Sequence, residues 1–141
     1  MGRAGTDSIA ALNTNVLLLF LLQDDAAQSA VATRLIRQAL EAGETLYVPV
    51  SVALELEWVP RSRFKLDQAA VAQTFAGLLQ TVELNFEATA ALEWALREHE
   101  SSAADFSDCI HAALAWSAGE QPLWTFDKKA AKVGGAKLLT A

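Results

Sequence analysis

The stretch that most constrains the fold is residues 9–22, an apolar run that is broken once by the polar segment Asn13-Thr14-Asn15. A short apolar run, a polar break and a second apolar run are typical of a buried strand that is followed directly by a helix. Asn13 would then lie at the carboxyl end of the strand. In open α/β sheets ligands bind at that end, because helix amino termini and short loops converge there. We therefore expect the functional site to be built around Asn13.

Strand and helix patterns alternate along the rest of the chain. The predicted strands cover residues 9–12, 46–48, 82–84, 122–126 and 136–139. The predicted helices cover residues 16–22, 26–42, 52–61, 68–79, 87–98 and 105–118, with a brief helix after Asp127. Such alternation indicates an α/β fold with a mainly parallel central sheet flanked by helices.

The sequence also predicts how individual helices begin, end and pack. Ser51 is expected to cap the helix that follows the second strand, and Asp67 to cap the next helix. Pro60 is expected to kink or end the first of these, because proline lacks a backbone N–H and clashes with the preceding turn. The helix over residues 26–42 is expected to bury an apolar stripe, which consists of Val31, Leu35, Ile36, Ala39 and Leu40.

Length and composition favour one globular domain. A chain of 141 residues can form one sizeable core, and we expect a loose segment at residues 1–8 and a domain at residues 9–141. The hydrophobic fraction of 52% excludes disorder, and the net charge of -6 argues against nucleic-acid binding by a broad basic face. Residues 16–22, the longest apolar run, are too short to span a bilayer, so no membrane is expected.

One cysteine, Cys109, excludes an internal disulfide. It is expected to be a core residue, since Cys109 and His111 are two positions apart on a helix and point in different directions. A cytoplasmic location is the default expectation. Gly134-Gly135 lacks the lysine and hydroxyl of a phosphate loop and is interpreted as a turn.

Four acidic residues stand at informative positions. Glu55 lies in the helix after the second strand, Asp105 and Asp108 share one face near a helix start, and Asp127 directly follows a strand. Each has an ordinary structural explanation, since aspartates often cap helices and a helical glutamate is usually solvated.

The combination of these acids carries more information than any one of them. A parallel sheet would bring Asn13 and Asp127 together, because both end strands, and Asp108 begins the helix that leads to Asp127. Neighbouring carboxylates repel one another unless a cation neutralises them. Mg²⁺ or Mn²⁺ suits such a site of oxygen ligands.

Four segments resemble, in order and spacing, the successive motifs of PIN-domain ribonucleases, and above all those of the VapC toxins of bacterial toxin–antitoxin pairs. The segments are residues 11–18, 54–59, 104–113 and 125–129, and the resemblance covers residues 9–139. It implies a metal-dependent endoribonuclease with a parallel sheet and an acidic pocket that holds Mg²⁺ or Mn²⁺.

The resemblance also implies roles for individual residues. The catalytic positions would be Asn13, Glu55, Asp108 and Asp127. The metal ligands would be Glu55, Asp105, Asp108 and Asp127. Polar positions that line or brace the pocket in the family correspond to Thr14, Asn15, Ser51 and Thr125.

Asn13 departs from the family, which has aspartate at this position. An amide can offer one oxygen to a metal, but it lacks the negative charge and can present its NH₂ group instead. Metal affinity and the activation of water should both fall. The chain is either a naturally weakened member or one in which Asn13 was introduced to disable a toxic nuclease. We favour the second explanation, because the other motifs are in place.

The expected partners are an RNA substrate, a VapB-type antitoxin and a second copy of the chain. The candidate contacts to the RNA backbone are Arg61, Arg63, Lys65, Lys128, Lys129 and Lys132, each of which could equally be solvated surface charge. The candidate apolar patch for a protein partner is Phe20, Trp58, Val59 and Phe64. The alternative function is a non-catalytic PIN-like module that binds a protein or RNA.

The sequence generates one direct prediction. In the presence of Mg²⁺ or Mn²⁺, the Asn13→Asp chain should cleave total bacterial RNA, and a chelator should abolish the cleavage because the metal supplies the catalysis. The chain with Asn13 should cleave weakly or not at all. If neither the Asn13 chain nor the Asn13→Asp chain cleaves RNA although both are folded, the non-catalytic binding module is favoured.

Overall fold

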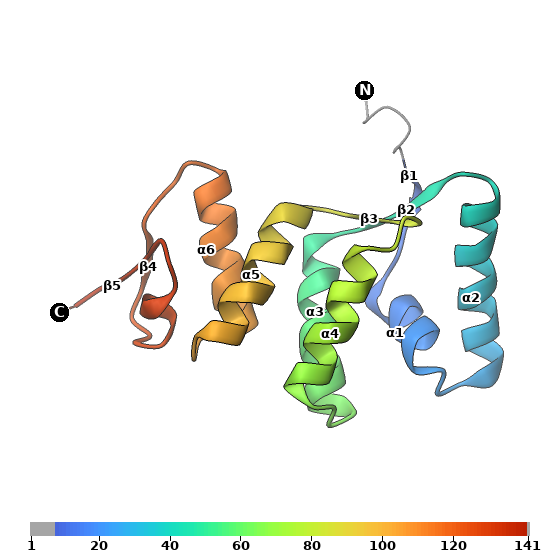
Figure 1. Cartoon of the computed structure of the whole chain (residues 1–141), viewed down its shortest axis with the longest axis horizontal. Helices are drawn as coiled ribbons and strands as arrows, with labels where there is room; N and C mark the ends of the chain where they lie inside the picture. The colour runs from blue at the N-terminus through green and yellow to red at the C-terminus, as the bar shows by residue number, and fades with distance from the viewer. Residues whose placement is uncertain (1–7, 141) are drawn as a thin grey trace. The chain divides into compact units, whose positions relative to one another are not determined.

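Helices and strands alternate along the chain, and the strands pair in parallel (Figure 1). The computed structural model describes residues 8–140, so residues 1–7, most of the segment expected to be loose, lie outside the described residues. The elements are β1 (Ser8–Ala11), α1 (Thr14–Leu22), α2 (Ala26–Glu41), β2 (Thr45–Val48), α3 (Val50–Arg63), α4 (Gln68–Leu79), β3 (Leu84–Phe86), α5 (Thr89–Ser101), α6 (Phe106–Ser117), β4 (Leu123–Thr125), the 3₁₀ helix η1 (Ala130–Lys132) and β5 (Ala136–Leu138). The predicted α/β fold is confirmed.

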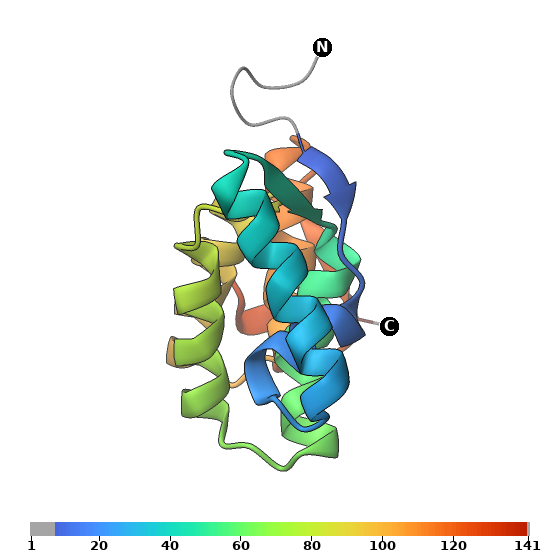
Figure 2. The same cartoon turned by 90° about the vertical axis from the view of Figure 1, so that its right-hand side faces the viewer.

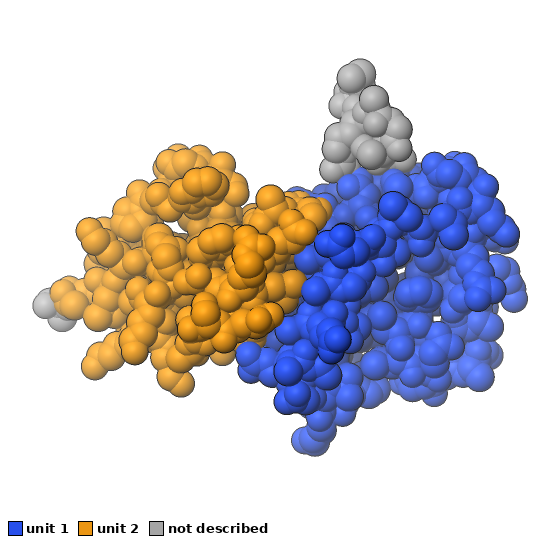
Figure 3. Space-filling view, in the orientation of Figure 1, with its two compact units in different colours: residues 1–87 blue, residues 88–141 orange. Residues whose placement is uncertain are grey.

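The chain divides into two compact units, coloured blue and orange in Figure 3. Unit 1 comprises residues 1–87 and contains the sheet β1-β2-β3. Unit 2 comprises residues 88–141 and contains the two-stranded sheet β4-β5. The single domain predicted over residues 9–141 stays a prediction.

The sheet of unit 1 is parallel throughout. β1 pairs with β2, and β2 pairs with β3 so that Leu46 faces Leu84 and Val48 faces Phe86. Parallel strands need a long crossover, and two helices supply each one, α1 and α2 first and then α3 and α4. Figure 2 shows α2 in front of this unit with β1 and β2 side by side. Leu46 and Val48 are fully buried, so the middle strand forms part of the core.

The expectation that β1 is a buried strand is wrong. Ile9 is 54% exposed, and Ala10 and Ala11 are exposed as well. β1 is an edge strand that pairs only with β2 in its sheet, whereas β2 pairs with a strand on each side. Its apolar composition therefore does not reflect burial in this sheet.

Helix α2 forms where predicted, but of the predicted stripe only Ile36 and Ala39 are buried, and Leu35 is exposed. Ala32, Ile36 and Ala39 are buried, whereas Val31 is 59% exposed and Leu40 is 54% exposed. Small side chains let α2 approach α1 and β2, which it contacts. No single described helix is long and apolar enough to cross a membrane, although α1 and α2, bent by 106°, pass the length and composition test as a pair.

Helix α3 differs from the prediction at both ends. Pro49 occupies the N-cap position and its carbonyl accepts the Ala53 N–H, so Ser51 lies inside the helix and does not cap it. Pro60 does not end the helix, which continues to Arg63. In this last turn the proline removes only one backbone hydrogen bond of the helix. In the same part of α3, the Arg61 guanidinium donates two hydrogen bonds to the Glu57 carboxylate. Nε lies 2.6 Å from Oε2 and Nη2 lies 2.8 Å from Oε1.

The boundaries of two further elements also shift. β3 runs from Leu84 to Phe86 and not over residues 82–84, because Leu84 and Phe86 are the buried members of the alternation while Val82 is 76% exposed. Asp67 precedes α4 as predicted, but its side chain forms no capping hydrogen bond.

Unit 2 consists of the helix pair α5 and α6 and the strands β4 and β5. Helix α5 buries one apolar face, which consists of Ala91, Leu92, Ala95 and Leu96. β4 pairs in parallel with β5, and the short helix η1 lies in the connection between them. Gly134 and Gly135 form the predicted turn before β5.

The packing of unit 1 predicts a large effect at Phe75. Its side chain is 2% exposed and its ring centroid lies 6.0 Å from that of Phe86. Phe75→Ala should lower the free energy of unfolding by about 3–5 kcal/mol, because it leaves a cavity between α4 and β3. Val82→Ala, at an exposed position, should change it by less than about 0.5 kcal/mol. Equal effects in urea denaturation would contradict this packing.

Candidate functional site

Asn13 caps helix α1 at the carboxyl end of β1. The N–H of Leu12 still donates to the Tyr47 carbonyl at 2.8 Å, so the chain leaves the sheet only at the next residue. Asn13 has an extended backbone, and its Oδ1 accepts the Thr14 N–H at 2.7 Å. The position predicted for Asn13, between strand and helix, is confirmed.

Thr14 links the start of α1 to Glu55 on α3. Its side chain is buried, and its hydroxyl Oγ1 donates to Glu55 Oε1 at 2.5 Å. Thr14 therefore braces Glu55. Ser51 lies one turn before Glu55, and both are exposed on α3. Asn15 instead borders a groove between α1 and α2 that also includes Val31.

Asp105 and Asp108 lie at the start of α6 in unit 2. Asp105 is the N-cap residue of α6, but its carboxylate accepts no hydrogen bond from the backbone N–H groups of the first helical turn. The Asp108 carboxylate accepts the backbone N–H of Asp105, as the third helical residue does in a capping box. This bond holds Asp108 beside Asp105.

Asp127 follows β4 as predicted and begins the turn that leads into η1. Its Oδ1 accepts the N–H groups of Lys129 at 2.8 Å and Ala130 at 3.3 Å. Its own N–H donates to Thr125 Oγ1 at 3.0 Å. Asp127 thus has a structural role, and Thr125 fixes the backbone at this position.

The three aspartates of unit 2 affect one another electrostatically. Partial burial, together with the negative charges of Asp105 and Asp127, raises the pKa of Asp108 above its ordinary value. His111 and the bond from the Asp105 N–H act in the opposite direction on the same pKa. In the described part of the chain, none of these three carboxylates forms a salt bridge. Burial is the largest cause of the raised pKa of Asp108, and the charges of the other two aspartates add to it.

Cys109 is a core residue, as expected. Its side chain is fully buried, and burial raises the pKa of its thiol to about 11. A thiol with such a pKa stays protonated at neutral pH and does not act as a nucleophile.

The predicted RNA contacts have different surroundings. Arg61 is engaged by Glu57, which is 3% exposed, so this pair has a structural role in α3. Glu57 was not among the predicted site residues, although the four-residue spacing of Glu57 and Arg61 is a usual signal for such a pair. The exposed lysines that follow Asp127 are Lys128, Lys129 and Lys132, and the exposed basic residues at the end of α3 are Arg63 and Lys65.

The site residues fit Mg²⁺ or Mn²⁺ by their chemistry. Glu55, Asp105, Asp108 and Asp127 offer carboxylate oxygens, the donors that these ions prefer. A cation would also relieve the repulsion around Asp108. Glu55 belongs to unit 1 and the three aspartates to unit 2. Over residues 8–140, no group of three His, Cys, Asp or Glu side chains is gathered closely enough to hold a metal ion.

Comparison with known proteins identifies one family. A model of the PIN domain matches residues 10–136, most of the chain and all of the positions discussed above. None of the curated proteins compared with the chain matches it.

The raised pKa of Asp108, which burial and neighbouring charges cause, predicts that removing its charge stabilises the fold. The raised pKa means that ionisation of Asp108 opposes folding. Asp108→Asn should therefore raise the melting temperature at pH 7 by about 1–2 °C, a small effect because the group is largely solvated.

The pH dependence gives this prediction its sign. The gain should be present above the raised pKa of Asp108 and should vanish below the ordinary pKa of 3.8, where both states are protonated. Asp24→Asn, at an exposed aspartate between α1 and α2, is the matched control. A lower melting temperature for Asp108→Asn at pH 7 would contradict the repulsion.

Proposed function

This chain belongs to the PIN-domain family, whose members are generally metal-dependent nucleases, and we propose that it is an endoribonuclease of the VapC toxin type, weakened or disabled by Asn13. The observation that carries the proposal is the group Asp105, Asp108 and Asp127 in unit 2. Partial burial, together with the charges of Asp105 and Asp127, raises the pKa of Asp108, and no described salt bridge neutralises these carboxylates. Proteins tolerate such repulsion where a bound cation and a reaction require it.

The metal ligands would be Glu55, Asp105, Asp108 and Asp127. Bound Mg²⁺ or Mn²⁺ would supply the positive charge that polarises a scissile phosphate and favours the ionisation of water. Thr14 would limit the rotation of Glu55 through its hydroxyl. The backbone N–H groups of Lys129 and Ala130 would orient Asp127 while leaving its negative charge in place. Lys128 and Lys129 would approach the RNA backbone beside this carboxylate.

Asn13 would limit catalysis through its chemistry and its hydrogen bond. The amide adds no negative charge to the acidic group, and its Oδ1 already accepts the Thr14 N–H. An aspartate at this position would have a second anionic oxygen to offer a metal ion while the first capped α1. We therefore attribute full activity to the form with aspartate at position 13.

A toxin of this type would act in the cytoplasm and pair with a VapB-type antitoxin and with a second copy of itself. Of the proposed apolar patch, Trp58 is 56% exposed and Phe64 is 40% exposed, so both are available to a protein partner. Val59 is 8% exposed and belongs to the core. A basic residue of the antitoxin would complement the carboxylates.

The second candidate function is a non-catalytic PIN-like module that binds a protein or RNA. The observation that favours it is the bond from Thr14 N–H to Asn13 Oδ1, which gives Asn13 a complete structural role as a helix cap. In this case the form with aspartate at position 13 would also be inactive.

The proposal is tested by removing one ligand from the restored enzyme. In a chain that carries Asn13→Asp, the further change Asp108→Asn should lower the turnover of RNA at least about 100-fold, because a metal ligand is lost. It should also weaken Mn²⁺ binding in calorimetry. Adding Asp24→Asn instead should change neither quantity. Undiminished turnover with Asp108→Asn would remove Asp108 from the active site.

A further inference from the structure

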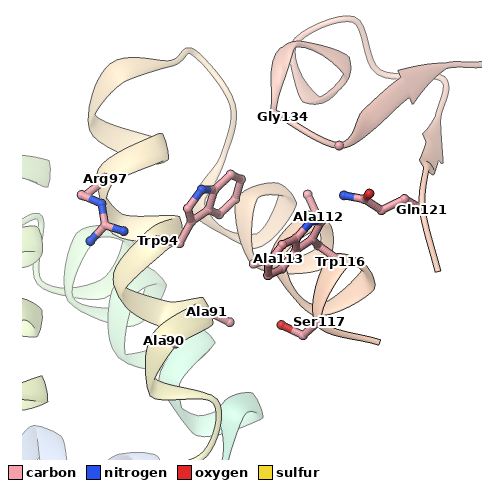
Figure 4. Close-up of a pocket in the computed structure, with 11 residues that line it drawn as sticks. Ala90, Ala91, Trp94, Arg97, Ala112, Ala113, Trp116, Ser117, Gln121 and Gly134 are labelled. Carbon is pink, nitrogen blue, oxygen red and sulfur yellow. The ribbon is translucent and has the colours of Figure 1, made fainter. Parts of the chain in front are cut away.

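Unit 2 contains a cavity between α5 and α6 that the acidic site does not use. Its volume is about 440 Å³, which is in the range of small-molecule sites (Figure 4). The buried side chains of Ala91, Ala112 and Ala113 form its floor. Because these side chains are small, the two helices leave room above them for a planar group.

Two tryptophans border this cavity. Figure 4 shows Trp94 projecting from α5 toward α6, with Trp116 on the facing helix. Trp116 is 67% exposed, an unusual setting for the largest apolar side chain. Exposed aromatic faces beside a cavity are the usual stacking surfaces for the bases of single-stranded nucleic acids.

The opposite wall supplies hydrogen-bonding groups. The Gln121 amide lies so close to Gly135 that a Cβ atom there would come within 2.9 Å of Gln121 Nε2. Glu98 Oε2 accepts the Gly134 N–H at 3.3 Å and so ties this turn to α5. A glutamine amide at the wall of the cavity can donate to and accept from the edge of a base. The cavity thus combines stacking surfaces with a polar edge.

The negative net charge of the chain favours contacts to RNA bases over contacts to RNA phosphates. The net charge of -6 argues against a protein that holds RNA mainly by a broad basic face. Stacking on tryptophan is insensitive to that charge and supplies affinity without a basic face.

The pocket is also aligned with the acidic group. Asp108, Ala112 and Trp116 follow one another at four-residue spacing and lie along one ridge of α6. Eight residues of helix span about 12 Å, the length of roughly three to four stacked nucleotides. One strand could therefore reach both ends of α6.

We propose that Trp94, Trp116 and Gln121 form a pocket for a base of single-stranded RNA, a few nucleotides from the bond that is cleaved. The proposal rests on the proposed ribonuclease function for its choice of ligand. It assigns the pocket to substrate recognition and leaves the reaction to the acidic residues.

The test measures binding of a fluorescent single-stranded RNA of mixed sequence by the full chain, in the presence of a chelator so that nothing is cleaved. Trp94→Ala and Trp116→Ala should each raise the dissociation constant about 5- to 150-fold, through loss of one stacked base. Trp116→Phe should retain part of the affinity, because it keeps a ring. Trp124→Ala, at an exposed tryptophan on β4 outside the pocket, should have no effect. Circular dichroism checks that each variant is folded.

The outcomes separate this inference from the proposed function. If both alanine variants bind RNA like the unchanged protein, the pocket does not bind bases, whether or not the Asn13→Asp chain cleaves RNA. If they lose affinity while the folded Asn13→Asp chain does not cleave, the pocket stands and the nuclease assignment fails. A change in oligomeric state without a change in RNA affinity would show that the tryptophans contact a second copy of the chain, and would overturn the proposal.

Discussion

The parallel pairing of β1 with β2 is the constraint on which the first half of the site depends. Parallel strands run in the same direction, so both segments leave the sheet at one edge. The bond from Leu12 N–H to the Tyr47 carbonyl carries this pairing to the last residue before Asn13. Helices α1 and α3 therefore begin close together, and the Thr14 hydroxyl can reach Glu55. No local preference of either segment would produce that contact.

In unit 2 the ionisation of Asp108 acts against the stability of the unit that contains it. Each aspartate has a backbone role near a helix start, and these roles place negative charges where they raise the pKa of Asp108. Under the proposed function, stability and catalysis make opposing demands on Asp108. Opposition of this kind is common at reactive sites and is weaker in regions that serve folding alone.

Much of the architecture could be predicted from the pattern of apolar residues, because helix and strand periods differ strongly. The positions of Asn13, Glu55, Asp105, Asp108 and Asp127 relative to strand ends and helix starts were predictable for the same reason. The exposure of Ile9 and Val31 was not, since periodicity identifies an apolar face but not the partner that covers it. Helix α3 does not end at Pro60, because the effect of a proline depends on how many helical bonds follow it. The Trp94 and Trp116 cavity depends on α5 and α6 packing together, which spacing along the chain does not reveal.

The capping role of Asn13 has an evolutionary consequence. Asparagine and aspartate cap helices about equally well, so exchanging one for the other leaves the start of α1 almost unchanged. The same exchange removes a charge that metal chemistry needs. Under the proposed function, position 13 is therefore a place where a catalytic lineage can lose its activity in a single step and still keep a folded protein. Selection on folding would not oppose the exchange of aspartate for asparagine. A descendant without nuclease activity could then persist and compete for the partners of its active relatives.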